Sequence, residues 1–202
     1  PVGIIQANTL GTINVCQFAV KNNALVFFAS TREIYGKIEG KEFVKESDMG
    51  VCDCIEDRAC YPESKRISET ICKSYNLQYK MKYQICRIAH VYGPGMNIEN
   101  DGRIMSDIIS DIVNNRNIVL KSDGSAQRAF CYLSDAIRAI FFILLNGQEN
   151  DVFNLSNEEE EISIKDLANL STKLFTEKNI KVKYQTSNEN TNLYTNYKRS
   201  KL

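Results

Sequence analysis

The most informative stretch of the chain is Ala24-Leu25-Val26-Phe27-Phe28-Ala29-Ser30-Thr31-Arg32-Glu33-Ile34-Tyr35-Gly36. Its apolar first half is typical of a buried strand, and it ends abruptly in hydroxyls and a carboxylate. Polar groups at the C-terminal end of a strand lie where open α/β sheets bind ligands. The stretch therefore predicts a strand over about 24–29 that carries functional side chains at its end.

A second stretch of the same form follows further along the chain. It is Tyr83-Gln84-Ile85-Cys86-Arg87-Ile88-Ala89-His90-Val91-Tyr92-Gly93-Pro94-Gly95, which breaks into a Gly-Pro turn. This predicts a strand over about 83–89. The intervening sequence predicts a loop to about residue 57 and a helix from there to about residue 79.

Tyr61 and Lys65 lie on this predicted helix, and their spacing of about one turn places a phenol beside an ammonium. Tyrosine titrates near ~10, and it becomes a useful proton acceptor at neutral pH only where a nearby positive charge favours the phenolate. Lys65 supplies such a charge. The same spacing also occurs on exposed helices without any function, so the pair indicates a base only together with the two flanking strand ends.

The rest of the chain shows the alternation of helices and strands that is typical of α/β proteins. Helices are expected at about 3–22, 103–114, 133–146 and 164–176, the last with Ser163 as its N-cap. Short strands are expected at about 118–120, 128–132 and 152–155.

Composition limits the partners of the protein. The 202 residues include 25 Lys plus Arg and 25 Asp plus Glu, so no overall charge draws the chain to nucleic acid or to an anionic membrane. The longest strongly apolar run, 139–145, is far shorter than the roughly 20 residues of a membrane span. No secretory signal pattern is found, and we expect a cytoplasmic protein.

Cysteine usage points away from a metal site. Of the seven cysteines only Cys52 and Cys54 lie close together, and the chain has one histidine. This is not the ligand set of a zinc site, and reduced thiols with no metal are expected.

Five ordered motifs together resemble the extended short-chain dehydrogenase/reductase family, specifically its nucleotide-sugar epimerases, dehydratases and decarboxylases. The segments that carry the resemblance are Asn8 to Asn14, Ser30 to Gly36, the Tyr61-Lys65-Glu69 helix, Arg87 to Pro94 and Asp123 to Asp135. Several motifs in the family's order are far more specific than any one of them.

The resemblance implies an α/β fold, the C-terminal part of a Rossmann-type doubly wound parallel sheet plus a smaller α/β substrate lobe. Residues 1–94 are expected to form the part of the Rossmann domain that holds the catalytic residues. Residues 95–202 are expected to form mainly the nucleotide-sugar lobe, with some segments returning to the sheet. No G-x-G-x-x-G turn occurs in the sequence. We therefore expect a fragment that lacks the N-terminal NAD-binding half, does not hold NAD tightly and is inactive alone.

The resemblance also implies roles for four residues around the cofactor, which is NAD, with NADP left open. Tyr61 takes a proton from a sugar hydroxyl while hydride passes to the nicotinamide. Lys65 holds the nicotinamide ribose, and the Thr31 hydroxyl bonds the same sugar oxygen. Ala89 stands where many relatives have an aromatic residue near the nicotinamide.

Three features of the sequence favour one reaction within the family. Dehydratases of the family usually carry an aspartate where this chain has Arg32, which argues against elimination of water. Glu33, and the segment from Asn100 to Ile104 that includes Arg103, are similar to the family's UDP-glucuronate decarboxylases. Decarboxylation of UDP-glucuronate is therefore the leading specific expectation. In the opposing interpretation Glu33 and Arg103 are solvated surface residues.

Two further side chains are expected to contact the substrate. Arg128 matches the family's arginine that binds the nucleotide diphosphate, and a guanidinium suits phosphate oxygens. His90 replaces an asparagine that contacts phosphate in most relatives, and it is either a phosphate donor or an ordinary polar residue at a strand end.

Two other functions stay open for the chain. One is a catalytically silent nucleotide-sugar binding protein, and the other is a nucleotide-sugar ketoreductase that consumes NADPH. Relatives often dimerise through the helix containing Thr12 and the Tyr61 helix, so a homodimer is expected. The polar segment 187–196 is expected to be mobile unless ligand orders it.

Overall fold

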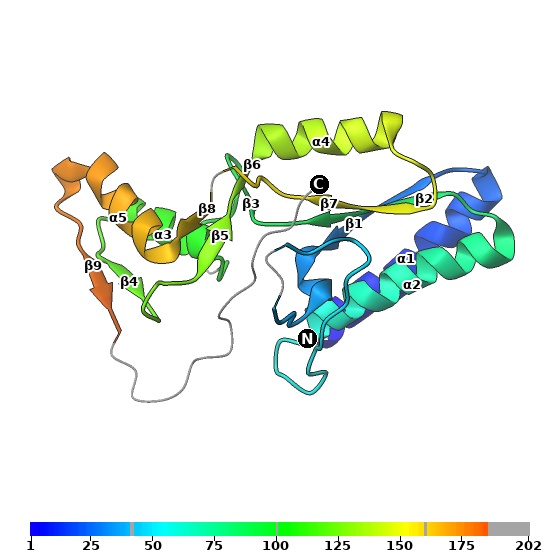
Figure 1. Ribbon diagram of the computed structural model, residues 1–202, viewed down its shortest axis with the longest axis horizontal. Helices are drawn as coiled ribbons and strands as arrows, with labels where there is room; N and C mark the ends of the chain where they lie inside the picture. Colours follow the sequence, from blue (N-terminus) through cyan, green and yellow to red (C-terminus); the bar gives the residue numbers. More distant parts are fainter. Residues whose placement is uncertain (41–42, 100, 160, 186–202) are drawn as a thin grey trace. The chain divides into compact units, whose positions relative to one another are not determined.

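The computed structural model describes residues 1–40, 43–99, 101–159 and 161–185 (Figure 1). They form two compact units. The first unit contains residues 1–89 and 134–156, and the second contains residues 90–133 and those described from 157 onward. The segment 187–196 and Asn100 lie outside the described residues.

The first unit is built on a parallel sheet of three strands in the order β1-β2-β7. Its strands are β1 (Val26–Thr31), β2 (Tyr83–Ile88) and β7 (Asp151–Leu155). The chain enters β7 only after passing through the second unit, so a late segment returns to complete the sheet of the first unit.

Helices cover both faces of this sheet. Helices α1 (Val2–Asn22) and α2 (Cys60–Tyr79) lie side by side on one face, and α4 (Leu133–Asn146) lies on the other (Figure 1). The core under α1 and α2 consists of Cys16, Ala19, Val26, Cys72, Met81, Tyr83 and Ile85. On the α4 face, the buried Gln84 Nε2 donates to the carbonyl oxygens of Ile143 and Gly147, each at 2.9 Å.

Local sequence explains where α2 begins and ends. Pro62 lies in the first turn, where the missing N–H needs no partner and the fixed φ suits a helix. Lys80 follows the last turn with a left-handed φ of 58°, and its N–H donates to the Asn76 carbonyl at 2.9 Å.

Strand β1 runs directly into the 3₁₀ helix η1 (Arg32–Tyr35). Thr31 caps this helix, because its Oγ1 accepts from the Glu33 N–H at 3.3 Å. Gly36 then turns with a φ of 63°, and a Cβ there would lie 2.5 Å from the Val51 carbonyl oxygen. The chain after β1 is thus folded closely back on itself beside the strand end.

The second unit contains three two-stranded sheets, two parallel and one antiparallel. The parallel pairs are β3 (Val91–Tyr92) with β6 (Cys131–Tyr132), and β4 (Ile118–Leu120) with β9 (Val182–Tyr184). The antiparallel pair is β5 (Gln127–Ala129) with β8 (Glu161–Ser163). Its helices are α3 (Ile104–Val113), α5 (Ile164–Leu174) and η2 (Thr176–Lys178).

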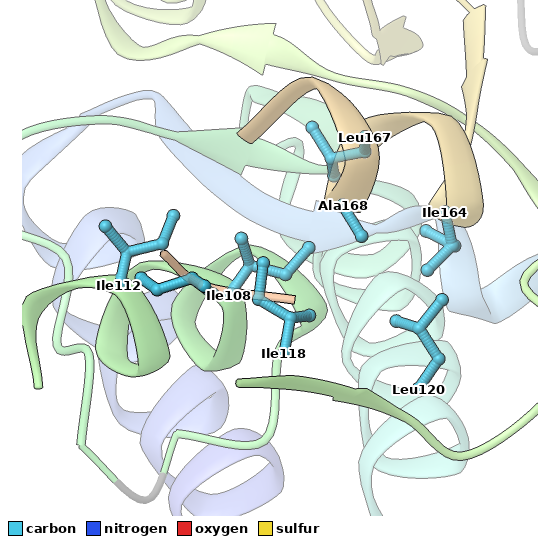
Figure 2. Packing of buried hydrophobic residues seen from close by; sticks show 8 residues of the cluster. Ile108, Ile112, Ile118, Leu120, Ile164, Leu167 and Ala168 are labelled. Atoms are coloured by element: carbon cyan, nitrogen blue, oxygen red, sulfur yellow. The ribbon is translucent and has the colours of Figure 1, made fainter. Parts of the chain in front are cut away.

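Apolar side chains, mostly from α3, β4 and α5, form the core of the second unit (Figure 2). The buried members are Ile108, Ile112, Ile118, Leu120, Ile164, Leu167, Ala168 and Ile180. Ser163 begins α5 as expected, and its Oγ accepts from the Asp166 N–H at 2.9 Å.

The α/β fold class with a parallel sheet is confirmed, and the expected helices begin and end within a few residues of the observed ones. The expected strand at 128–132 is wrong in detail. It consists of two strands, β5 and β6, that pair with different partners and are separated by Phe130. Strands β3, β8 and β9 were not predicted, because two or three residues carry too little periodicity.

Over the described ranges, none of the helices is long and apolar enough to cross a membrane. All seven cysteine thiols are free.

Candidate active site

Five of the expected site residues lie in the first unit, and four of them lie at the C-terminal end of β1 and the start of α2. Thr31 ends the strand, Glu33 lies in η1, and Tyr61 and Lys65 occupy the first turns of α2. The structure brings Thr31 and Tyr61 together, because the Thr31 side chain is one of the groups that act on the pKa of the Tyr61 phenol. The negative charge of Glu33 also acts on the Tyr61 phenol.

The pKa of Tyr61 is raised above its usual value. Burial is the main cause, the hydrogen bond with Thr31 opposes it, and the charge of Glu33 adds to it. Thr31 is the side chain that lowers the pKa of the phenol here. The expected activation of the phenol by Lys65 stays a prediction.

Lys65 makes its own contacts beside the end of β1. Its Nζ donates to the Ala29 carbonyl oxygen at 2.9 Å and lies 4.8 Å from the centre of the Phe28 ring. Burial lowers the pKa of Lys65. An ammonium carries three donors, so Lys65 can bind a further oxygen beside the strand end while it keeps the bond to Ala29.

Ala89 directly follows β2 and is only 3% exposed. Its N–H donates to the Leu155 carbonyl oxygen at 2.9 Å, which extends the pairing of β2 with β7 by one residue. A small side chain suits this closely packed position.

The other three expected site residues, His90, Arg103 and Arg128, lie in the second unit. His90 has a left-handed φ of 44°, and its ring centre lies 5.8 Å from that of Phe130. Histidine is one of the residues that are enriched at left-handed φ values among non-glycine residues.

Arg103 forms an ion pair with Asp101 at the start of α3, and its side chain is 55% exposed. The hydrogen bond from Arg103, followed by one from Ser106, lowers the pKa of Asp101. Arg128 lies on β5, where its Nη1 donates to the Gln127 carbonyl oxygen at 2.7 Å. Both guanidinium groups are thus engaged by neighbours that are close in sequence.

A buried polar row crosses the sheet of the first unit beside the candidate site. Ser30, Arg87 and Asn154 are direct register partners on the three strands. Glu69 of α2 reaches this row: its Oε1 accepts from Ser30 Oγ at 2.5 Å and from Arg87 Nε at 3.1 Å, and its Oε2 accepts from Arg87 Nη2 at 2.7 Å. Burial alone lowers the pKa of Arg87, but the hydrogen bond and charge of Glu69 outweigh it, so the pKa is raised.

Tyr35 of η1 completes the cluster. Its Oη accepts from Arg87 Nη1 at 2.9 Å and donates to Asn154 Oδ1 at 2.5 Å. The guanidinium also lies 4.8 Å from the centre of the Tyr35 ring. We call the five side chains Ser30, Tyr35, Glu69, Arg87 and Asn154 the strand-end clamp.

Sequence reasoning assigned no role to the strand-end clamp, although four of its members lie in the motifs quoted above. The signal was a charged residue inside an apolar strand, because Arg87 can be buried only with a partner. Nothing in the sequence named that partner. Asn154 gave no signal at all, because asparagine at a strand end is ordinary.

Polar contacts also fix α2 against α1. Asn8 Nδ2 donates to Ser64 Oγ at 2.8 Å, and Ser68 Oγ donates to the Asn8 carbonyl oxygen at 2.8 Å. Ser64 directly precedes Lys65, so these bonds hold the part of α2 that carries the candidate site.

Comparison with known families identifies the chain. A family model described as "NAD dependent epimerase/dehydratase family" matches residues 1–156. The chain belongs to this family, for which NAD is the cofactor.

Curated relatives that match the chain include UDP-glucuronic acid decarboxylases. One from Arabidopsis thaliana, decarboxylase 6, is 34% identical over 160 residues, which cover 79% of this chain and 46% of the relative. Decarboxylase 1 of Xenopus tropicalis is also 34% identical over 160 residues, covering 79% of this chain and 37% of the relative. The chain thus spans about half or less of the length of these relatives.

A solved structure shows the same fold. The UDP-glucose 4-epimerase of Thermotoga maritima, solved with UDP-glucose, aligns with a TM-score of 0.81 at 19% identity. The alignment covers 97% of this chain and 60% of the epimerase. Both units of this chain therefore have counterparts in a Rossmann-type epimerase.

Proposed function

We propose that this chain carries the catalytic residues of an NAD-dependent enzyme that decarboxylates UDP-glucuronate. The observation that carries the proposal is the grouping of Thr31, Glu33 and Tyr61, because both Thr31 and Glu33 act on the pKa of the Tyr61 phenol. The choice of UDP-glucuronate rests on the 34% identity to UDP-glucuronic acid decarboxylases, and on Glu33 and Arg32.

The residues present fit the nicotinamide end of NAD. Lys65 keeps donors beyond the one used on Ala29, which suits the hydroxyls of a ribose. The buried, small Ala89 lies at the end of the next strand. The sequence contains no glycine-rich turn for the pyrophosphate, so these residues account for only one end of the cofactor.

Tyr61 is assigned the proton transfers of the reaction. When bound, NAD accepts a hydride from the sugar C4 and later returns it. Tyr61 Oη takes the proton of the C4 hydroxyl, which leaves a ketone at C4. Thr31 Oγ1 donates to the same oxygen as its negative charge develops.

The C4 ketone labilises the neighbouring carboxylate at C5. The bond from C5 to the carboxylate breaks, carbon dioxide leaves, and its electron pair forms an enolate with the ketone. A proton then adds to C5. Tyr61 returns its proton to the C4 oxygen as the hydride is restored, so the net products are carbon dioxide and UDP-xylose.

Glu33 is assigned a place beside the reacting carbons. It lies in η1, two residues after Thr31, and its charge already acts on Tyr61. Arg32 stands where dehydratases carry their aspartate, so the chain lacks the acid that elimination of water requires. Both features favour decarboxylation over dehydration.

His90, Arg103 and Arg128 are proposed to bind the nucleotide part of the substrate. All three belong to the second unit, which is proposed as the nucleotide-sugar lobe. Guanidinium groups suit the diphosphate. Replacing Arg128 with Met is expected to raise KM about tenfold or more with a smaller change in kcat, since the residue binds phosphate rather than reacting atoms.

The protein is further proposed to be a homodimer in which α1 and α2 of each copy form a four-helix interface. The two helices leave apolar side chains exposed, including Leu10 at 56%, Val15 at 54% and Phe18 at 66% on α1, and Ile67 at 45% on α2. A charged replacement, Phe18→Glu, is expected to give monomers in sedimentation. An unchanged mass would contradict this interface.

The direct test uses the intact protein, meaning the longest natural chain that contains these residues. It is incubated with NAD and UDP-glucuronate, and in parallel with NAD and other UDP-, TDP-, CDP- and GDP-sugars. The masses of the products are measured by mass spectrometry. Loss of carbon dioxide from UDP-glucuronate alone is the expected result. Unchanged masses with every sugar would reject decarboxylation.

Tyr61→Phe is the matching variant, and turnover is expected to fall at least about 100-fold. Tyr79→Phe is the control, because Tyr79 lies at the far end of α2 and is 51% exposed. A silent binding protein would bind the sugar equally with or without the Tyr61 hydroxyl and show no turnover in either case. A ketoreductase would consume NADPH stoichiometrically.

A further inference from the structure

The three-residue segment Thr31–Glu33 is held on both sides by the strand-end clamp. Ser30, which precedes it, donates to Glu69 at 2.5 Å. Tyr35, which follows it, binds Arg87 at 2.9 Å and Asn154 at 2.5 Å. The ends of the segment are thus tied to two charged side chains that are themselves paired.

We infer that the strand-end clamp is a positioning unit for the reaction, which holds Thr31 and Glu33 in place against Tyr61. This inference rests on the proposed function, since that function assigns Thr31 and Glu33 to the substrate. The members of the clamp are positioning residues and touch no reacting atom.

The hydrogen bonds of the clamp leave little capacity for a ligand. Both carboxylate oxygens of Glu69 accept from Ser30 or Arg87, and every guanidinium nitrogen of Arg87 donates within the cluster or to the Glu46 carbonyl at 2.8 Å. Arg87 is 6% exposed. Buried groups with this many partners fix geometry, because hydrogen bonds are directional.

Helix α2 supplies both the reactive phenol and the anchors. Arg66 follows Lys65 on this helix, and its Nε donates to the Ile34 carbonyl at 2.6 Å while its Nη2 donates to the Gly50 carbonyl at 3.1 Å. Glu69 lies one turn after Lys65. Helix α2 therefore carries Tyr61 and also holds the residues on both sides of the segment Thr31–Glu33.

A packed apolar cluster would stabilise this position as well as a buried ion pair does. A polar cluster differs from an apolar one because its hydrogen bonds are all satisfied in only one arrangement of the side chains. Misplacement of reacting groups by about 1 Å is enough to slow an enzyme about 100-fold. The clamp is placed where such precision is needed, directly on either side of Thr31 and Glu33.

The test uses Ser30→Ala, Tyr35→Phe and the double variant in the intact protein. Each single change removes one tie and keeps the size of the side chain nearly constant, so the variants fold. Because either tie alone still restrains the segment, the single variants are expected to lower kcat about threefold, and the double variant about 100-fold. KM is expected to stay within about threefold in all three.

Lys82→Met is the matched control. Lys82 forms an exposed ion pair with Glu149 at 2.9 Å, next to the start of β2, at the opposite end of that strand from the clamp. Its kcat and KM are expected to equal those of the parent. A double variant whose kcat stays within threefold of the parent, or whose loss is in KM alone, would overturn the inference.

A second readout does not depend on activity. Amide hydrogen exchange of a peptide spanning 31–36 reports the Glu33 N–H, which donates to Thr31 Oγ1, and the Gly36 N–H, which donates to the Glu33 carbonyl at 3.1 Å. Exchange in this peptide is expected to rise at least about tenfold in the double variant, and exchange in α5 is expected to stay unchanged.

The two readouts separate failure of the inference from failure of the proposed function. If the parent turns over no nucleotide sugar, the proposed function is rejected, and faster exchange at 31–36 still supports the clamp as the holder of this segment. Unchanged exchange at 31–36 in the double variant would overturn the clamp in either case.

Discussion

On one face of the sheet in the first unit, apolar contacts dominate toward the start of the strands, and hydrogen bonds dominate at their C-terminal ends. Toward the start of the strands, the register row Phe28, Ile85 and Val152 packs against α1 and α2. One step toward the strand ends, the row Ser30, Arg87 and Asn154 is polar. Apolar burial is non-directional and stabilises the fold, whereas directional bonds define positions. On this face of the sheet, an apolar row that stabilises the fold and a polar row that positions side chains are therefore only two residues apart.

The largest effect on stability is expected from removing the buried ion pair between Arg87 and Glu69. Arg87→Met leaves Glu69 buried without its partner, and the free energy of unfolding is expected to fall by about 3–5 kcal/mol. Urea unfolding of the intact protein measures it. Adding Glu69→Leu removes the unpaired charge and is expected to recover much of the loss. A double variant less stable than the single one would contradict this account.

A smaller loss is expected from the apolar end. Ile85 is 2% exposed, and Ile85→Ala is expected to lower the free energy of unfolding by about 3 kcal/mol through lost burial and a cavity. Ile85→Val should cost about 1 kcal/mol. Turnover per folded molecule is expected to stay constant, measured below the unfolding transition. A fall in kcat comparable with that of the clamp variants would remove the distinction between the two ends.

Alkaline pH is expected to weaken the fold through the buried phenols. Burial is the main cause that raises the pKa of Tyr35, Tyr61 and Tyr83. Between the unfolded pKa, about 10, and the higher folded values, the folded state binds more protons, so stability falls as pH rises. Unfolding midpoints from about pH 8 to about pH 11 measure this, and Tyr83→Phe should reduce the slope. A midpoint that rises over this range would contradict the prediction.

The smallest effect is expected at the exposed start of β2. Lys82 and Glu149 form an ion pair with side chains about half exposed, at 53% and 48%. Lys82→Met is expected to change the free energy of unfolding by less than about 0.5 kcal/mol, because solvent screens the pair. Comparing Lys82→Met with Arg87→Met in one unfolding assay sharpens the contrast between exposed and buried charges. Equal losses of unfolding free energy in the two variants would show that burial does not decide how much an ion pair stabilises this protein.

Much of the first unit could be predicted from its sequence, because long elements repeat their signal. The 21 residues of α1 and the 20 residues of α2 each contain several helical turns, and β1 and β2 are each six residues long and largely apolar. The strands of the second unit have two or three residues, which is too short for periodicity. Of these strands, β4 was predicted with its observed bounds. Their pairings join distant segments, such as Ile118 with Val182.

In the candidate site, too, some features could be predicted from the sequence and others could not. Thr31, Glu33, Tyr61 and Lys65 could be selected from motifs, since each motif is local. The electrostatics could not be read in the same way. Spacing places the Lys65 ammonium near Tyr61, but in the fold it donates to the Ala29 carbonyl at 2.9 Å, and Thr31 is the neighbour that lowers the pKa of the phenol.

The sequence by itself determined the α/β class and the residue types at the strand ends, because these depend on periodicity and local spacing. Its five ordered motifs carried the resemblance to the family. Only the tertiary structure decided which charges are paired and which groups hold the reactive segment. Glu69 and Arg87 are 18 residues apart and Tyr35 and Asn154 are 119 apart. Contacts at such separations depend on the register of neighbouring strands and on how a helix packs across them, which no local pattern encodes.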